Sequence, residues 1–195
     1  MSAGMHEQRS ALITRVVGGL AMLALVAALI FAFFDDATSR PLAPNGDTVG
    51  KESAEPYSVY AARAADTLAA ADDPAYALVT FTHPLTPEET QAALGSVGRV
   101  NAMVIDSAPP FPLPEPVDGA SRSSVFHTQL DRIALMLSGV GEVPVPERID
   151  AVVVYDAGDS LREVASHTDI ATVEVLPADA SWGRFGVRPV EVPQG

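Results

Sequence analysis

Residues 76–106 read YALVTFTHPLTPEETQAALGSVGRVNAMVID and contain the clearest pattern of strands and helix in the chain. This stretch opens with a β-branched and aromatic run, which predicts a strand. The sequence TPEE at 86–89 then has a hydroxyl at the N-cap, proline at the first helical position and glutamate at the third, which is the pattern of a capping box. A short helix to about Leu94 is therefore expected, followed by a second strand over 99–106.

The same strand–helix–strand pattern returns in residues 149–176. IDAVVVY and TVEVL predict the two strands. The helix between them is expected to begin at Asp159 or Ser160, with Glu163 completing a capping box from Ser160. Two such units, each with a short helix, predict a four-stranded sheet with helices on one face. This is the arrangement of a ferredoxin-like α+β sandwich.

Three further segments surround these units. Residues 53–71 repeat apolar side chains at helical spacing and predict a helix. The proline-rich stretch 109–116 predicts an extended linker. Residues 121–140 predict an inserted helix whose apolar stripe packs on the core. That stripe comprises Phe126, Leu130, Ile133, Leu137 and Val140, with Met136 beside it.

Residues 16–34 are an uninterrupted apolar run that predicts one membrane-spanning helix. At a rise of roughly 1.5 Å per residue, this run approaches the roughly 30 Å of a bilayer's hydrocarbon core. Arg9 and Arg15 precede it, and Asp35 and Asp36 follow it. By the positive-inside rule the N-terminus is expected in the cytoplasm and the bulk of the chain outside it, on an uncleaved anchor in the cell membrane.

The sequence therefore predicts five parts along the chain. They are a cytoplasmic leader (1–15), the transmembrane helix (16–34), a flexible linker rich in Pro, Gly, Asn, Asp and Ser (35–52), an extracytoplasmic α+β domain (53–181) and a C-terminal tail (182–195).

Two groups of residues are candidate contacts. Ala24, Ala28 and Ala32 form a small-residue face that could pack against another membrane helix, although alanine is so frequent in this chain that chance explains the spacing better. Trp182 and Phe185 in the tail either pack back on the sheet, which we favour, or remain exposed as a partner-binding patch.

Composition limits the classes of function. From Asp35 onward the chain has 24 acidic and 10 basic side chains, a surplus that repels nucleic acid. There is no cysteine, so disulfides and cysteine metal sites are excluded. The four histidines do not have the spacing of metal ligands, and no motif for a nucleotide or metal cofactor occurs. No cofactor or metal is therefore expected.

Ser123, His127 and Asp131 are the nearest approach to a catalytic constellation. They are four residues apart on one helical stripe, so neighbouring pairs could form hydrogen bonds. A regular helix interior, however, has no free N–H groups to build an oxyanion hole beside the serine. The stripe is therefore interpreted as the polar face of an amphipathic helix, and the protein is not expected to be an enzyme.

The stretches YALVTFTHPLTPEE (76–89), IDAVVVYDAGDSLREVASHTDIATVEVLP (149–177) and GVRPVEVP (186–193) resemble a family of actinobacterial single-pass membrane proteins of unknown function with an extracytoplasmic α+β domain. The motifs that carry this resemblance are structural and imply no known activity. Residues 159–177 are also similar to the second half of inhibitor-like propeptides of subtilisin-type proteases, which supports the ferredoxin-like fold more than inhibition.

These observations predict a membrane-anchored, non-enzymatic domain that binds protein, as an accessory part of a cell-envelope or respiratory membrane complex. The alternative is a protease-inhibitor-like or chaperone-like domain that acts through a sheet edge. A hydrolase that uses Ser123, His127 and Asp131 is the third hypothesis.

Overall fold

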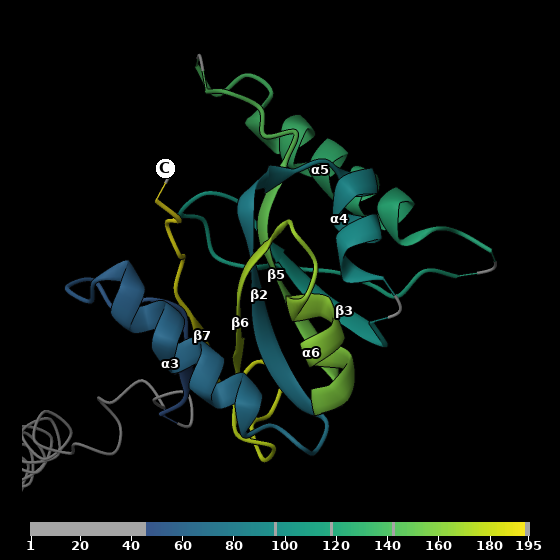
Figure 1. Ribbon diagram of the computed structural model, residues 1–195. Helices are drawn as coiled ribbons and strands as arrows, with labels where there is room; N and C mark the ends of the chain where they lie inside the picture. Colours follow the sequence, from purple (N-terminus) through teal and green to yellow (C-terminus); the bar gives the residue numbers. More distant parts are fainter. Residues whose placement is uncertain (1–45, 96, 118, 142, 194–195) are drawn as a thin grey trace, which may run out of the picture. The chain divides into compact units, whose positions relative to one another are not determined.

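The computed structural model describes residues 46–95, 97–117, 119–141 and 143–193 (Figure 1). The predicted leader, membrane helix and alanine face (Ala24, Ala28 and Ala32) lie outside the described residues, as does most of the predicted linker, so these remain predictions. No helix in the described part of the chain is both long enough and apolar enough to cross a membrane.

The described chain has an α+β architecture built on a five-stranded antiparallel sheet with the strand order β4-β3-β5-β2-β6. A separate parallel pair consists of β1 (Thr48–Val49) and β7 (Gly186–Val187). The five strands are β2 (Ala75–Leu85), β3 (Arg99–Val104), β4 (Phe111–Pro112), β5 (Ile149–Asp156) and β6 (Ile170–Val175). The helices are α3 (Tyr57–Ala69), α4 (Pro87–Leu94), α5 (Arg122–Leu137) and α6 (Gly158–Ala165).

The two expected strand–helix–strand units are present and interleaved. Helix α4 connects β2 to β3, and α6 connects β5 to β6. Strand β5 lies between β2 and β3, while β2 lies between β5 and β6. The two central strands therefore come from different units, so the sheet forms only when both units are folded together.

The start of α4 confirms the predicted capping box. Thr86 Oγ1 accepts a hydrogen bond from the Glu89 N–H at 3.3 Å, and Glu89 Oε2 accepts one from the Thr86 N–H at 2.8 Å. The hydrogen bond from the Thr86 N–H is the main reason that the pKa of Glu89 lies below its usual range. Local sequence therefore sets where this helix begins.

The prediction that Asp159 or Ser160 caps α6 is wrong. The helix begins earlier, at Gly158, with Ala157 in the N-cap position and no side-chain cap or capping box. A Cβ atom at Gly158 would lie 1.9 Å from the carbonyl oxygen of Ala71, just beyond α3. Glycine at this position lets the chain after α3 approach the first turn of α6, and this contact is between elements distant in sequence.

One face of the sheet, which we call the helix face, packs against α4, α5 and α6 (Figure 1). In α5, Phe126, Leu130 and Ile133 are buried there, as predicted. Leu137 also packs against this core, partly buried, as predicted. The prediction is wrong for Met136 and Val140, which are 62% and 55% exposed. Helix α5 ends at Leu137, so Val140 lies in the following turn and does not continue the helical face.

The two edges of the sheet are occupied differently. Helix α3 lies along the edge strand β6, and Thr67 Oγ1 accepts a hydrogen bond from the Val175 N–H at 3.0 Å. At the opposite edge, the proline-rich stretch predicted as a linker contributes β4, whose Phe111 and Pro112 pair with β3. Proline has no N–H to donate, so this edge offers few backbone donors to another strand.

The opposite face of the sheet, the segment face, is covered by β1 and by residues 177–193, which we call the C-terminal segment. Val49 in β1 is 1% exposed. The prediction of a flexible linker over 35–52 is therefore wrong for β1, because pairing with β7 supplies partners for its backbone that the local sequence does not reveal.

Candidate functional site

An aromatic cluster of four side chains lies on the segment face. Tyr76 is at its centre, with its ring centroid 4.8 Å from that of Tyr155, 5.8 Å from that of Trp182 and 5.2 Å from that of Phe185. The rings of Trp182 and Phe185 are 5.9 Å apart in an edge-on arrangement. Tyr155 and Trp182 are 38% and 40% exposed, so the cluster presents two large aromatic surfaces to solvent.

Strand pairing places the two tyrosines together. Tyr76 in β2 lies directly opposite Tyr155 in β5, and side chains opposite each other in an antiparallel pair share a face. Turns in the C-terminal segment then bring Trp182 and Phe185 over them. The Ala180 N–H donates to the Pro177 carbonyl and the Arg184 N–H to the Ser181 carbonyl, each at 3.0 Å.

Arg99 extends the row across the sheet. It lies opposite Tyr155 on β3, so Arg99, Tyr155 and Tyr76 follow one another across three strands. The Arg99 side chain is 55% exposed, and its Nε lies 3.8 Å from Glu115 Oε1. Exposed tyrosine, tryptophan and arginine side chains in one patch are the residue types that contribute most to protein–protein binding.

The favoured packing of the C-terminal tail is confirmed. Phe185 and Val187 are partly buried against the core of the segment face, while Trp182 contacts Tyr76 and Phe185 and keeps substantial exposure. Nothing in the local sequence marks Tyr155 and Arg99 as members of this patch. Both belong to strands predicted correctly, but the register between the strands was needed to align them.

A buried ionic cluster holds the N-terminal side of the segment face in place. Glu174 in β6 is 3% exposed and accepts a hydrogen bond from the Gly50 N–H at 2.6 Å. Arg63 in α3 pairs with Glu174, lies 3.0 Å from Glu55 Oε2 and donates to the Gly50 carbonyl at 3.2 Å. The hydrogen bond with Arg63 is the main reason that the pKa of Glu55 lies below its usual range. Through Gly50, this cluster fastens β1 to β6 and α3.

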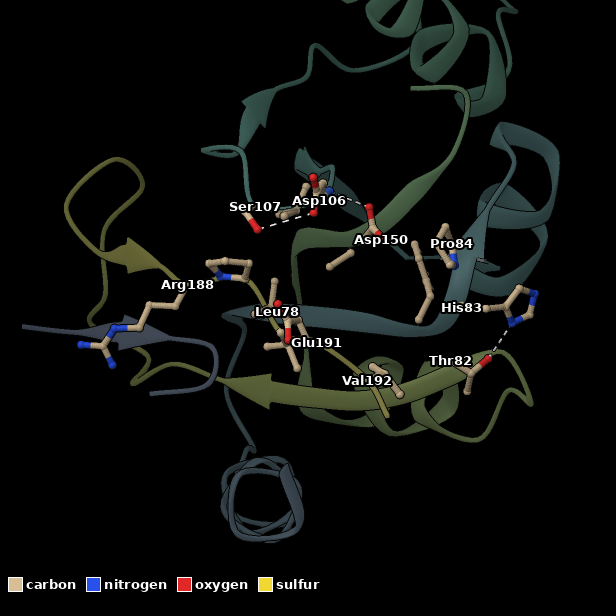
Figure 2. A pocket seen from close by; sticks show the side chains of 15 residues that line it. Leu78, Thr82, His83, Pro84, Asp106, Ser107, Asp150, Arg188, Glu191 and Val192 are labelled. Carbon is tan, nitrogen blue, oxygen red and sulfur yellow. Dashed lines mark hydrogen bonds between the residues drawn. The ribbon is translucent and has the colours of Figure 1, made fainter. Parts of the chain in front are cut away.

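A cavity of about 220 Å³ lies on the same face, between the sheet and the end of the C-terminal segment (Figure 2). Its apolar wall includes Leu78 and Val104, and Asp106 and Asp150 lie side by side on its rim. Asp106 has a left-handed φ of 49° and donates its N–H to Asp150 Oδ2 at 2.7 Å. Burial raises the pKa of Asp150, and this effect outweighs the hydrogen bond from the Asp106 N–H, which acts in the opposite direction.

The residues of the hydrolase hypothesis do not form a catalytic arrangement. His127 Nε2 lies 2.7 Å from Glu88 Oε1 on α4, rather than against Ser123 or Asp131. Ser123 Oγ lies 2.9 Å from Ser121 Oγ, at the start of the same helix. The His127 contact is the main reason that the pKa of Glu88 lies below its usual range. His127 is therefore not positioned as a general base for the Ser123 hydroxyl.

Within the part of the chain that the structure describes, no three His, Asp or Glu side chains are grouped to hold a metal ion. Comparisons of the chain with models of protein families, with curated proteins and with solved structures gave no match.

Proposed function

We propose that this protein is a membrane-anchored, non-enzymatic domain that binds a protein partner through the aromatic cluster and Arg99. The observation that carries the proposal is the exposure of Tyr155 and Trp182 in one patch with Arg99. Tyrosine and tryptophan provide a large contact area at a low cost in conformational entropy, and arginine is enriched with them among the residues that contribute most to binding. The membrane anchor in this proposal is the transmembrane helix predicted over residues 16–34.

The proposed fold of the domain is a ferredoxin-like sandwich. Four observations support it: two strand–helix–strand units, their interleaving as β3-β5-β2-β6, antiparallel pairing throughout, and helices α4 and α6 packed on the same face. Strand β4, helix α5 and helix α3 are then additions to that framework. The membership in an actinobacterial membrane-protein family that the resemblance implies remains a proposal.

The proposed role is that of an accessory subunit in a complex of the cell envelope or membrane. An anchor in the cell membrane would keep the domain near its partner and raise their effective concentration. The domain is expected outside the cytoplasm, as the predicted orientation of the anchor implies. Its acidic surplus supports a protein partner over nucleic acid.

The alternative, an inhibitor-like or chaperone-like domain that acts through a sheet edge, has less support. Such binding adds a strand to a free edge. Here α3 lies along β6, and prolines in and around β4 limit the donors at the other edge. The exposed aromatic patch therefore supports the first proposal better than either edge supports the second.

A pull-down of the full-length protein in mild detergent from the membranes of its source cells tests the main proposal. We expect a defined partner with the unaltered protein, and its loss with the double variant Tyr155→Ala and Trp182→Ala. Val59→Ala is the matched control, since Val59 is 54% exposed on α3 and lies outside the cluster. Equal recovery of the partner with the double variant and the control would refute the role of the aromatic cluster.

A further inference from the structure

Two arginines beside the aromatic cluster have guanidinium groups that are open to solvent. The Arg99 side chain is 55% exposed, and its one ion-pair contact among the described residues, with Glu115 Oε1, is 3.8 Å long, beyond hydrogen-bond distance. Arg184 lies between Trp182 and Phe185 in the sequence and is exposed. Its side chain forms no hydrogen bond or ion pair with another residue of the described chain. The donors of both groups are therefore available to a partner.

The other described arginines already contact oxygen atoms of the protein. Their guanidinium groups donate hydrogen bonds to carboxylate, amide or backbone carbonyl oxygens, or, in the case of Arg188, lie 3.5 Å from Glu52 Oε1. These arginines are Arg63, Arg122, Arg132, Arg148, Arg162 and Arg188. Guanidinium groups without such a contact therefore coincide with the exposed aromatic cluster and are not spread over the surface. An arginine has five N–H donors in a fixed planar arrangement, so each open group can bind one carboxylate through two of them.

The charges at the cluster differ from those of the protein as a whole. The chain has a formal net charge of −13, whereas the two arginines place positive charge at the cluster, of which Glu115 offsets a part. Asp156 follows Tyr155, but successive side chains of a strand point to opposite faces. Its two oxygens accept hydrogen bonds from the N–H groups of Gly98 and Ala157, at 2.7 and 2.8 Å. This part of an acidic protein therefore offers cationic donors to a carboxylate.

We propose that the aromatic cluster binds an acidic segment of the partner protein. Arg99 binds a carboxylate of that segment through two parallel hydrogen bonds, and an apolar side chain next to the carboxylate packs on the exposed rings of Tyr155 and Trp182. Tyr155 lies opposite Arg99 on the neighbouring strand, so adjacent residues of one segment can make both contacts. Arg184 is available for a second carboxylate. This inference rests on the proposed function, because it names the kind of partner for the same cluster.

The experiment uses the fluorescence of Trp182, which is the only tryptophan in the chain and so reports binding at the cluster. Two synthetic peptides, one with three repeats of Glu-Pro-Leu and one with three repeats of Lys-Pro-Leu, are titrated into the full-length protein in a non-ionic detergent. They have the same length and apolar content but opposite charge. The net charge of the protein by itself favours the lysine peptide. We expect the glutamate peptide to bind at least about tenfold more tightly.

Substitutions of Arg99 test whether its charge sets this preference. Arg99→Gln should lower the affinity for the glutamate peptide about tenfold, and Arg99→Glu should reverse the preference in favour of the lysine peptide. Arg132→Gln removes an exposed arginine on α5 and is the matched control, which should leave both affinities unchanged. Circular dichroism of each variant confirms that the fold is retained.

Four results would overturn the acidic partner. They are tighter binding of the lysine peptide, equal affinity for both peptides, no change in Trp182 fluorescence with either peptide, and an undiminished affinity of Arg99→Gln for the glutamate peptide. None of them affects the pull-down, in which loss of a defined partner with the double variant would still support the aromatic cluster as the binding site. The kind of partner and the site that binds it can therefore fail separately.

Discussion

Among the described residues, α4, α5 and α6 complete a core of 23 buried apolar residues on the helix face, whereas β1 and an irregular segment complete a core of eight on the segment face. Both cores share the same central strands, β2 and β5. The stabilising free energy increases with the apolar area that is buried, so the larger core provides most of the stability. The smaller core leaves side chains such as Trp182 partly exposed and free to contact a partner.

The difference shows how one face of a sheet can provide most of the stability while the other face keeps side chains available for binding. Helices bring many apolar side chains per unit length and satisfy their own backbone hydrogen bonds. An irregular segment needs outside partners for its backbone, and here β1 and the turns at 177–184 supply them. The segment face should therefore open locally at a lower cost than global unfolding.

Truncation at the centre of the helix face should have the largest effect. Phe126 is fully buried, and Phe126→Ala is expected to lower the free energy of unfolding by about 3–5 kcal/mol. Val49→Ala, its counterpart on the segment face, should cost only about 1–2 kcal/mol. Chemical denaturation of the full-length protein in detergent measures both. Equal losses would contradict the division between the two faces.

Breaking the ionic cluster should have the next largest effect. Arg63→Gln leaves the buried Glu174 carboxylate without its cation. Because the Arg63 side chain is 39% exposed, solvent screens part of the loss, and we expect about 1–3 kcal/mol rather than the full cost of a buried pair. Amide exchange at Gly50 and Gly186 should accelerate first, since the cluster fastens β1.

Arg132→Gln is the matched control for this test. Arg132 is an exposed arginine on α5 whose Nη1 lies 3.5 Å from Gln129 Oε1. Its substitution should change neither the stability nor the exchange at β1. If both arginine variants behaved alike, the ionic cluster would not be what holds the segment face.

Removing the α4 cap should have a smaller effect, confined to the helix face. Thr86→Ala deletes the hydroxyl that accepts the Glu89 N–H and is expected to cost about 1 kcal/mol. The lowered pKa of Glu89 means that its stabilising contribution is present above the ordinary carboxyl pKa and is lost as the pH falls through the lowered one. Thermal unfolding across this acid range checks the sign. Thr128→Ala, in the interior of α5, should shift the unfolding temperature less.

Trp182→Ala should have the smallest effect on stability and the largest on partner recovery. The side chain is 40% exposed and its ring contacts Tyr76 and Phe185, so we expect a loss of about 0.5–1 kcal/mol. Denaturation of the full-length variant gives this value. A loss comparable with that of Phe126→Ala would show that the C-terminal segment is part of the main core and would remove the basis for treating it as a binding surface.

Much of the framework was predictable from local sequence. The alternating and β-branched runs of β2, β3, β5 and β6 identified four strands, and the TPEE motif located the start of α4. These features depend on a residue and its near neighbours. The start of α6 was predicted wrongly because the close approach of Ala71 to Gly158, rather than a cap, governs it.

The candidate site depended on contacts between distant parts of the chain. Trp182 and Phe185 stood out as aromatic side chains in an irregular tail, but only strand register showed that Tyr155 and Arg99 join them. The pairing of β1 with β7 and the ionic cluster around Glu174 each join segments more than 100 residues apart. Local sequence patterns do not indicate which distant segments pair or in which register.

Local periodicity and composition were enough to predict the alternation of strands and helices, the burial of Phe126, Leu130 and Ile133 in α5 and the acidic surplus of the chain. They did not indicate that the C-terminal segment covers the second face of the sheet, or that Glu191 lines the same cavity as Asp106 and Asp150. The physical reason is that backbone pairing and apolar burial act between residues that are close in space, whatever their separation along the chain.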